Sequence, residues 1–212
     1  MANCNYLFCD CETGGTDPKV HSLLTTYFIV LDENFNMLDE LDLKLKPSDL
    51  SKLNVHPEAL EVTGINLENH LKDPQTITYE EGCVQLTLFL DKYKVKGKRI
   101  HYRLCGQNVE FDKNFILAQL ISDQTWNKYV NNKPLDTLRI VTFLQDIGFL
   151  PTELGRLESL DDYFGLPKGE THTAKDDTKM TVDVYKSLRK MIMDLKNNIG
   201  GTNNSILEII ER

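Results

Sequence analysis

The first fifty residues contain three stretches whose hydrophobic pattern is typical of β-strands. Residues 6–9 form an apolar run that leads into a glycine pair at 14–15, and residues 23–31 are rich in Thr, Tyr, Phe, Ile and Val. In residues 41–46 leucines alternate with charged side chains, as they do in a strand with one buried face. The connections between the three stretches are short, so the pattern predicts an antiparallel meander that ends at Pro47.

The pattern then changes to helices. A short helix is expected from Pro57 to Gly64, and Thr78 followed by Glu81 fits the capping box of a longer helix. Residues 99–106 alternate again between apolar and polar side chains. They predict a fourth strand.

The second half of the chain predicts one more strand and several helices. Apolar residues recur at helical spacing within residues 111–120, residues 135–138 form a short fifth strand that runs into a helix, and a long helix is expected over residues 174–196. This order predicts an α/β fold, with a mixed five-stranded sheet (antiparallel meander plus parallel strands) flanked by helices. We expect a single domain over residues 1–196 and a short C-terminal tail at residues 197–212.

Composition and charge are those of an ordinary globular protein. The chain has 212 residues, of which 41% are hydrophobic and 26% charged, and its start lacks the basic-then-apolar pattern of a signal peptide. Apolar stretches are shorter than a membrane span, and the five cysteines are odd in number without Cys-x-x-Cys spacing. We therefore expect an intracellular protein with free thiols, in a reducing compartment such as the cytoplasm and without a membrane partner.

Two carboxylates, Asp10 and Glu12, follow the first apolar run. Because side chains alternate along a strand, we expect both to project from the same face. Buried carboxylates repel one another unless cations lie between them, and their oxygens suit Mg²⁺ or Mn²⁺. The net charge of −8 argues against a protein that coats nucleic acid through bulk charge, but it is compatible with acids neutralised locally by divalent cations. The spacing indicates a metal site, and a strand that frays into a polar turn is the alternative.

Two further acids and one histidine lie where they could join this site. Asp112 falls beside the buried stripe of its predicted helix, where a helix cap or an arginine contact is the alternative role. In the last helix, the apolar face ends at Asp177 in the first turn, whereas Asp176 points outward. His172 precedes this helix, and the loop could place its imidazole over the same pocket.

Three segments together resemble the exonuclease motifs of a known family. They are residues 10–15 (DCETGG), 106–112 (GQNVEFD) and 172–177 (HTAKDD), which are similar to the three motifs of the DEDDh family of DnaQ-like 3′→5′ exonucleases. That family has a ribonuclease H-like fold. The match extends from about residue 5 to residue 190, and it looks closest to proofreading epsilon-like subunits, with ribonuclease T-like enzymes second.

The resemblance implies a two-metal site. Asp10, Glu12 and Asp177 would hold one Mg²⁺ or Mn²⁺ ion, and Asp10 would bridge to a second ion that Asp112 supports directly or through water. His172 would be the general base that takes a proton from the attacking water. Two such ions stabilise both the attacking and the leaving oxygen of a phosphodiester displacement.

The resemblance also implies contacts with the substrate. Backbone amides around Thr13 and Gly14 would contact the terminal 3′ nucleotide, while Asn108 and Phe111 would line the sugar and base pocket. Thr16 stands where the family often has a bulky apolar residue that wedges between the last bases. Phe111 is therefore expected to make more of the base contact.

The expected function is that of a metal-dependent 3′→5′ exonuclease that releases nucleoside 5′-monophosphates from single-stranded nucleic acid. DNA is favoured over RNA because of the subfamily that looks closer. The alternatives are an RNA-trimming exoribonuclease of the ribonuclease T or oligoribonuclease type and, from a different class, an inactive nuclease fold that binds nucleic acid. The expected partners are single-stranded 3′ ends, with a polymerase or replication partner as a further possibility.

Overall fold

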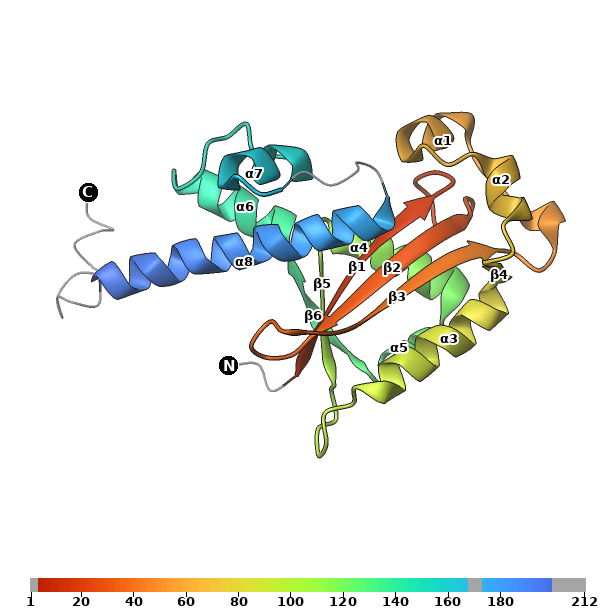
Figure 1. Ribbon diagram of the computed structural model, residues 1–212, viewed down its shortest axis with the longest axis horizontal. Helices are drawn as coiled ribbons and strands as arrows, with labels where there is room; N and C mark the ends of the chain where they lie inside the picture. The colour runs from red at the N-terminus through yellow and green to blue at the C-terminus, as the bar shows by residue number, and fades with distance from the viewer. Residues whose placement is uncertain (1–3, 168–172, 200–212) are drawn as a thin grey trace.

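The computed structural model describes residues 4–167 and 173–199 and contains a mixed six-stranded sheet in the order β4-β3-β2-β1-β5-β6. β1, β2 and β3 form the predicted antiparallel meander. The other three pairings are all parallel: β5 pairs with β1, β6 pairs with β5, and β4 pairs with β3. The predicted α/β class with a ribonuclease H-like arrangement is confirmed (Figure 1). The strands are β1 (Asn5–Thr13), β2 (Leu23–Leu31), β3 (Met37–Lys46), β4 (Thr76–Thr78), β5 (Tyr102–Gly106) and β6 (Val130–Asp136).

The observed strands differ from the prediction in number and in bounds; β3 begins at Met37 rather than at 41, and β5 begins at Tyr102 rather than at 99. The predicted count of five strands was wrong by one, because β4 has only three residues and is too short to show an alternating pattern. β6 begins at Val130, five residues before its predicted start at 135. Residues 131–134 are Asn, Asn, Lys and Pro, which have low strand propensity and are tolerated because β6 lies at the edge of the sheet.

The helices cover both faces of the sheet. They are η1 (Leu50–Lys52), α1 (Pro57–Thr63), α2 (Leu67–Lys72), α3 (Tyr79–Lys92), α4 (Val109–Phe115), η2 (Ile116–Leu120), α5 (Asp123–Trp126), α6 (Thr137–Asp146), α7 (Leu157–Phe164) and α8 (Ala174–Ile199). The predicted capping box of α3 is present, since Thr78 and Glu81 each accept a hydrogen bond from the other's backbone amide. α8 ends at Ile199, three residues beyond 196, so the predicted boundary between the domain and the C-terminal tail falls inside this helix. The domain limits stay a prediction.

The alternation of β1 separates two hydrophobic cores. Leu7, Cys9 and Cys11 point into the core that contains residues of α3, α4 and η2. Tyr6 and Phe8 point the other way, into a core that contains residues of α8. The next two residues of this second face are Asp10 and Glu12, so the strand period alone directs both carboxylates toward the start of α8.

α8 is held across the sheet by its apolar stripe. Thr181, Val184 and Leu188 are almost fully buried, as the sequence predicted, and Val184 and Leu188 belong to a third core with residues of α6 and α7. Figure 1 shows α8 running across the sheet and α1 and α2 gathered beside the end of β1. Within residues 4–167 and 173–199, no helix is both long and apolar enough to cross a membrane.

Candidate metal centre and substrate cleft

Three carboxylates from two elements meet at the end of β1. Asp10, Glu12 and Asp177 each offer an oxygen, and these oxygens all lie within 4.8 Å of one another. Two of the acids come from one face of β1, and the third comes from the first turn of α8. The structure therefore brings together the three residues for which the sequence predicted a shared metal ion.

The start of α8 is fixed by a local cap. The Thr173 hydroxyl accepts a hydrogen bond from the Asp176 amide at 3.1 Å and donates one to the Asp176 carboxylate at 2.7 Å. The Asp177 amide donates to the Thr173 carbonyl at 2.9 Å. Because Asp176 is used in this cap, Asp177 is the acid of the pair that faces β1. A cap of this kind typically contributes about 1 kcal/mol to helix stability.

Asp112 lies beside this group rather than within it. Its side chain on α4 is 3% exposed, and a hydrogen bond from the Cys11 amide lowers its pKa, whereas the Cys11 thiol donates to the Thr26 hydroxyl at 3.2 Å. The Cys11 amide is available because the pairing of β1 with β5 ends at Phe8 and Cys105, three residues earlier. Asp112 thus occupies the space that opens where the two strands part, and it is the strongest charged influence on Asp10.

Burial and mutual repulsion hold protons on these acids. The pKa of Asp10 is raised well above its usual value, first by burial and then by the charges of Asp112, Glu12 and Asp177. Burial, followed by repulsion from Asp177 and Asp112, raises the pKa of Glu12 to about 8, and burial is the main cause that raises the pKa of Asp112 to about 8.

This environment fits a divalent cation. An all-oxygen set of carboxylates is the donor type that Mg²⁺ and Mn²⁺ prefer. A cation among the carboxylates replaces the protons and removes the repulsion, so an arrangement that is unfavourable for bare carboxylates becomes a binding site. We call Asp10, Glu12 and Asp177, with the neighbouring Asp112, the acidic cluster. Its composition suggests dependence on a divalent metal.

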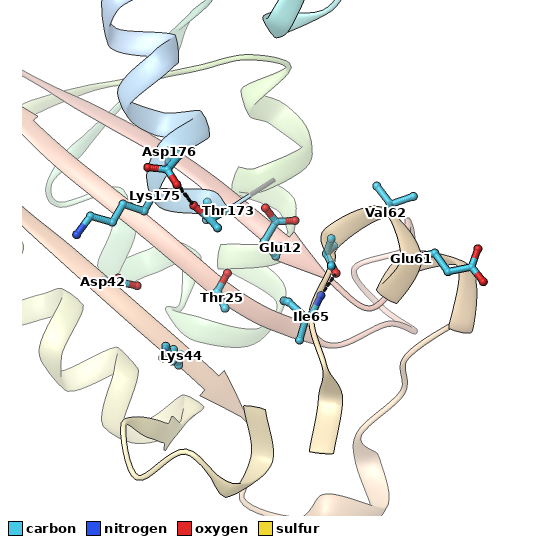
Figure 2. Close-up of a pocket in the computed structure, with 13 residues that line it drawn as sticks. Glu12, Thr25, Asp42, Lys44, Glu61, Val62, Ile65, Thr173, Lys175 and Asp176 are labelled. Atoms are coloured by element: carbon cyan, nitrogen blue, oxygen red, sulfur yellow. Dashed lines mark hydrogen bonds between the residues drawn. The ribbon is translucent and has the colours of Figure 1, made fainter. Parts of the chain in front are cut away.

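A pocket of about 560 Å³ opens beside Glu12, and we call it the metal-side pocket. Figure 2 shows its floor on β2 and β3, where Thr25, Asp42 and Lys44 lie. One wall is the end of α1 and the loop after it, residues 61–65, and the other is the start of α8, residues 173–176. A volume of this size is within the range of about 300–1,000 Å³ that is typical of small-ligand sites.

The turn after Glu12 is closely packed. A side chain at Gly14 would place its Cβ 2.7 Å from the Asn54 carbonyl oxygen, so only glycine fits. The Gly14 amide donates to the Ser22 carbonyl at 2.7 Å, and the Thr13 hydroxyl donates to the Gly15 carbonyl at 2.6 Å. The turn itself therefore uses the Gly14 amide as a donor, and the contact of backbone amides around Thr13 and Gly14 with a nucleotide stays a prediction.

Asn108 and Phe111 lie at the start of α4, the helix that contacts β1, β5 and β6. Asn108 adopts the left-handed conformation (φ 55°) and its side chain is exposed, while its amide donates to the Asp136 carboxylate at 3.0 Å. Phe111 is partly buried against Phe115, with a ring separation of 5.1 Å. The sequence analysis did not identify Asp136, the buried N-cap residue of α6 whose carboxylate accepts the Asn108 amide. Its only signal was its place in residues 135–138, which were predicted as a strand that runs into a helix.

The predicted general base, His172, lies outside the residues that the structure describes. The described chain resumes at Thr173, whose carbonyl accepts the hydrogen bond from the Asp177 amide. The role of His172 stays a prediction.

No family model matches the chain. The chain is 27% identical over 199 residues to an oligoribonuclease from Vibrio vulnificus, which covers 90% of this chain and 97% of that protein. It is 26% identical over 203 residues to an oligoribonuclease from Pasteurella multocida, covering 91% of this chain and 96% of the relative. Both similarities extend over nearly the whole length of each protein.

Solved structures of exonuclease I have the same fold. E. coli exonuclease I, in a zinc-bound complex with single-stranded DNA, superposes with a TM-score of 0.73 at 19% identity and covers 95% of this chain. Another exonuclease I structure gives a TM-score of 0.70, and this chain spans about two fifths of the length of these proteins, 43% and 41%. The sequence relatives and the shared fold support a DnaQ-like 3′→5′ exonuclease, which is a hydrolase, as the motifs predicted.

Proposed function

We propose that the chain is a metal-dependent exonuclease of the DEDDh subgroup that removes nucleoside 5′-monophosphates from the 3′ ends of single-stranded nucleic acid. The supporting observation is the convergence of Asp10, Glu12 and Asp177 within 4.8 Å, at the edge of a pocket of about 560 Å³. Four acids at one place would be costly in a protein that only binds nucleic acid, because burial raises the pKa values of Asp10, Glu12 and Asp112 without any gain in binding. This argues against the alternative of an inactive binding fold.

Each acid has a distinct part in this proposal. Asp10, Glu12 and Asp177 would hold one Mg²⁺ or Mn²⁺ ion, and Asp10 and Asp112 would hold a second. When bound, such ions acidify a water molecule and stabilise charge on both the attacking and the leaving oxygen of the phosphodiester. Asp112 is 3% exposed, so its carboxylate is kept beside Asp10 rather than in solvent.

Proton transfer and contact with the nucleotide are carried out by residues of the protein. His172 accepts the proton of the attacking water, since imidazole titrates near neutral pH. The terminal nucleotide lies beside Glu12, between the metal-side pocket and the turn at Thr13 and Gly14, with Asn108 and Phe111 on the opposite side of β1. The Gly14 amide donates to the Ser22 carbonyl and the Gly14 carbonyl accepts from the His56 amide, so contact with the turn is made by van der Waals packing.

The charge around the metal-side pocket favours short substrates. Lys44 is 2.5 Å from Asp73, and Lys175 lies 3.8 Å from Glu40, so the lysines that line this pocket are paired with acids. Affinity for long nucleic acid comes mainly from cations that neutralise successive phosphates. With these lysines paired, binding depends more on the metal ions and on contacts with one or two nucleotides.

Oligoribonucleotides are therefore proposed as substrates on an equal footing with DNA. The relatives named oligoribonuclease match over 97% and 96% of their own length, whereas exonuclease I, seen with single-stranded DNA, shares about two fifths of its length. The DNA preference expected from the sequence stays a prediction, as does a polymerase partner.

The test is hydrolysis of two 5′-labelled single strands of the same sequence, one RNA and one DNA, in Mg²⁺, in Mn²⁺ and in EDTA. We expect shortening by single nucleotides from the 3′ end, release of 5′-monophosphates, and no reaction in EDTA. A 3′-phosphate and a circular strand serve as controls and should resist. Efficient cleavage of the circle would show an endonuclease, and binding without cleavage in either metal would favour the inactive fold.

A further inference from the structure

The turn between β5 and α4, residues 106–108, sets where α4 begins and so where Asp112 lies. Asn108 is the N-cap residue of α4, and Asp112 lies in the first turn of this helix. α4 has only seven residues, and so short a helix keeps its place through contacts with its surroundings rather than through its own stability. Contacts that hold residues 106–108 therefore also place the Asp112 carboxylate.

Asp136, at the end of β6, connects this turn to the neighbouring strand. Its Oδ1 atom accepts one hydrogen bond from the Asn108 amide and another from the Leu138 amide, each at 3.0 Å. Its other oxygen, Oδ2, lies 3.5 Å from the Nε atom of Arg139. Asp136 is 5% exposed, and a buried amide that loses its acceptor is costly. The carboxylate therefore serves two helices, as the N-cap of α6 and as an anchor for the turn before α4.

Thr137 holds the same turn from the next position in the chain. Its hydroxyl shares its hydrogen between the Gly106 carbonyl, at 3.1 Å, and the side-chain oxygen of Gln107. Thr137 is almost fully buried. A Cβ at Gly106 would lie 2.9 Å from the Cys9 carbonyl oxygen, so the turn packs directly against β1 next to the acidic cluster. We call Asp136 and Thr137 the turn clamp.

The turn clamp lies where the parallel pairings of β5 end. Gly106 and Asp136 are the last paired residues of β5 and β6, and the pairing of β1 with β5 ends at Phe8 and Cys105. Asp112 lies in the space beyond this point. Burial is the main cause that raises its pKa, and the charge of Asp136 adds to the rise, so the two carboxylates are close enough to influence each other.

We propose that Asp136 is a positioning residue for the second metal ion, because it fixes the turn that keeps Asp112 beside Asp10. The proposal rests on the proposed function and adds to it a residue that contacts neither metal nor substrate, since both Asp136 oxygens already contact protein donors. The first ion is assigned to acids of β1 and α8, which this turn does not hold. Loss of the turn clamp should therefore weaken the binding of one ion selectively.

The test measures metal binding in the wild type and in two variants of Asp136. Titration with Mn²⁺, followed by electron paramagnetic resonance of the free ion, gives the number of bound ions and their Kd values without any cleavage. In Asp136→Ala the second ion should bind about ten- to a hundredfold more weakly, while the Kd of the first ion should stay within about threefold of the wild type. Asp136→Asn should restore most of the second-ion affinity, because its amide oxygen can accept the same two hydrogen bonds.

Asn66→Ala is the matched control. Asn66 is the N-cap residue of α2, and its side chain accepts the Asn69 amide at 2.9 Å, so this variant also loses a helix cap but lies outside the turn clamp. It should bind both ions as the wild type does. Circular dichroism shows whether each variant folds. Thr137→Val, which removes only the hydroxyl hydrogen bond, replaces Asp136→Ala if the latter does not fold, and it should weaken the second ion in the same way.

Each outcome decides the proposal. Equal second-ion affinity in the wild type and Asp136→Ala overturns it, as does an Asp136→Asn variant that binds as weakly as Asp136→Ala. A loss of the same size for both ions, or in Asn66→Ala, would show a general structural effect and also overturns it. A wild type that binds fewer than two ions leaves no second ion to position, with the same result. If the wild type binds two ions but cleaves no strand, the proposed function has failed, and the titration still judges the positioning role.

Discussion

Replacing Glu12 by Gln should make the metal-free protein more stable at neutral and mildly alkaline pH. The folded chain keeps a proton on Glu12 up to a pKa of about 8, whereas an ordinary glutamic acid loses it near 4.5. Between these values the unfolded chain is ionised and the folded chain is not, so the free energy of unfolding falls as pH rises. The stabilising effect of the proton is fully present below about pH 4.5 and is lost by about pH 8.

The magnitude follows from the size of the pKa shift. One proton of difference corresponds to about 1.4 kcal/mol per pH unit, so Glu12 contributes a loss of about 5 kcal/mol across this window. Gln cannot titrate, and its neutral side chain also reduces the repulsion on Asp10. The slope of unfolding free energy against pH should therefore be smaller in Glu12→Gln by at least about one proton.

The assay is urea unfolding in EDTA from pH 5 to pH 8, followed by the fluorescence of Trp126, the single tryptophan, which is 2% exposed. Glu58→Gln is the matched control, because the Glu58 side chain on α1 is 85% exposed. It should keep the wild-type slope. Equal slopes in the wild type and Glu12→Gln would refute the electrostatic account of the acidic cluster.

Three further predictions concern the metal, the base and the turn. In thermal-shift titrations with Mg²⁺, the wild type should gain about 2.7 kcal/mol at a hundredfold excess over Kd, and a folded Asp177→Asn variant should lose most of this gain; an equal gain would exclude Asp177 as a ligand. His172→Ala should slow single-turnover hydrolysis by ~10²–10⁴-fold, while His101→Ala, before the start of β5, should keep the wild-type rate; an unchanged His172→Ala rate and pH profile would remove this histidine from the mechanism. Gly14→Ala should lower the free energy of unfolding in urea by about 1–3 kcal/mol, because its Cβ would meet the Asn54 carbonyl at 2.7 Å; wild-type stability would show that the turn can relax.

The features that followed from local periodicity were predictable from the sequence. The alternation of β1 placed Asp10 and Glu12 on one face, and the helical period of α8 distinguished Asp177 from Asp176. Both are short-range properties that any strand or helix with these residues would have. They were sufficient to identify three members of the acidic cluster.

The remaining features depend on contacts between distant segments. The period of α4 placed Asp112 beside the buried stripe, but its position next to the other acids depends on where β1 and β5 part, after Phe8. The use of the Gly14 amide by Ser22 and the packing of His21 on Gly15 likewise depend on how the loop after β1 folds back. β4 could not be predicted because three residues carry no recognisable period.

The central claim is that metal ions held by the acidic cluster catalyse cleavage at a 3′ end, and Asp10→Asn tests it most directly. Asp10 belongs to both proposed ions, and Asn keeps its size while removing its charge. The measurement is single-turnover shortening of a 5′-labelled single strand in saturating Mg²⁺, with the fold checked by circular dichroism. Because bound metal contributes several kcal/mol to the transition state, the account predicts a folded variant about a thousandfold slower or more. A folded Asp10→Asn protein that cleaves at the wild-type rate would contradict it.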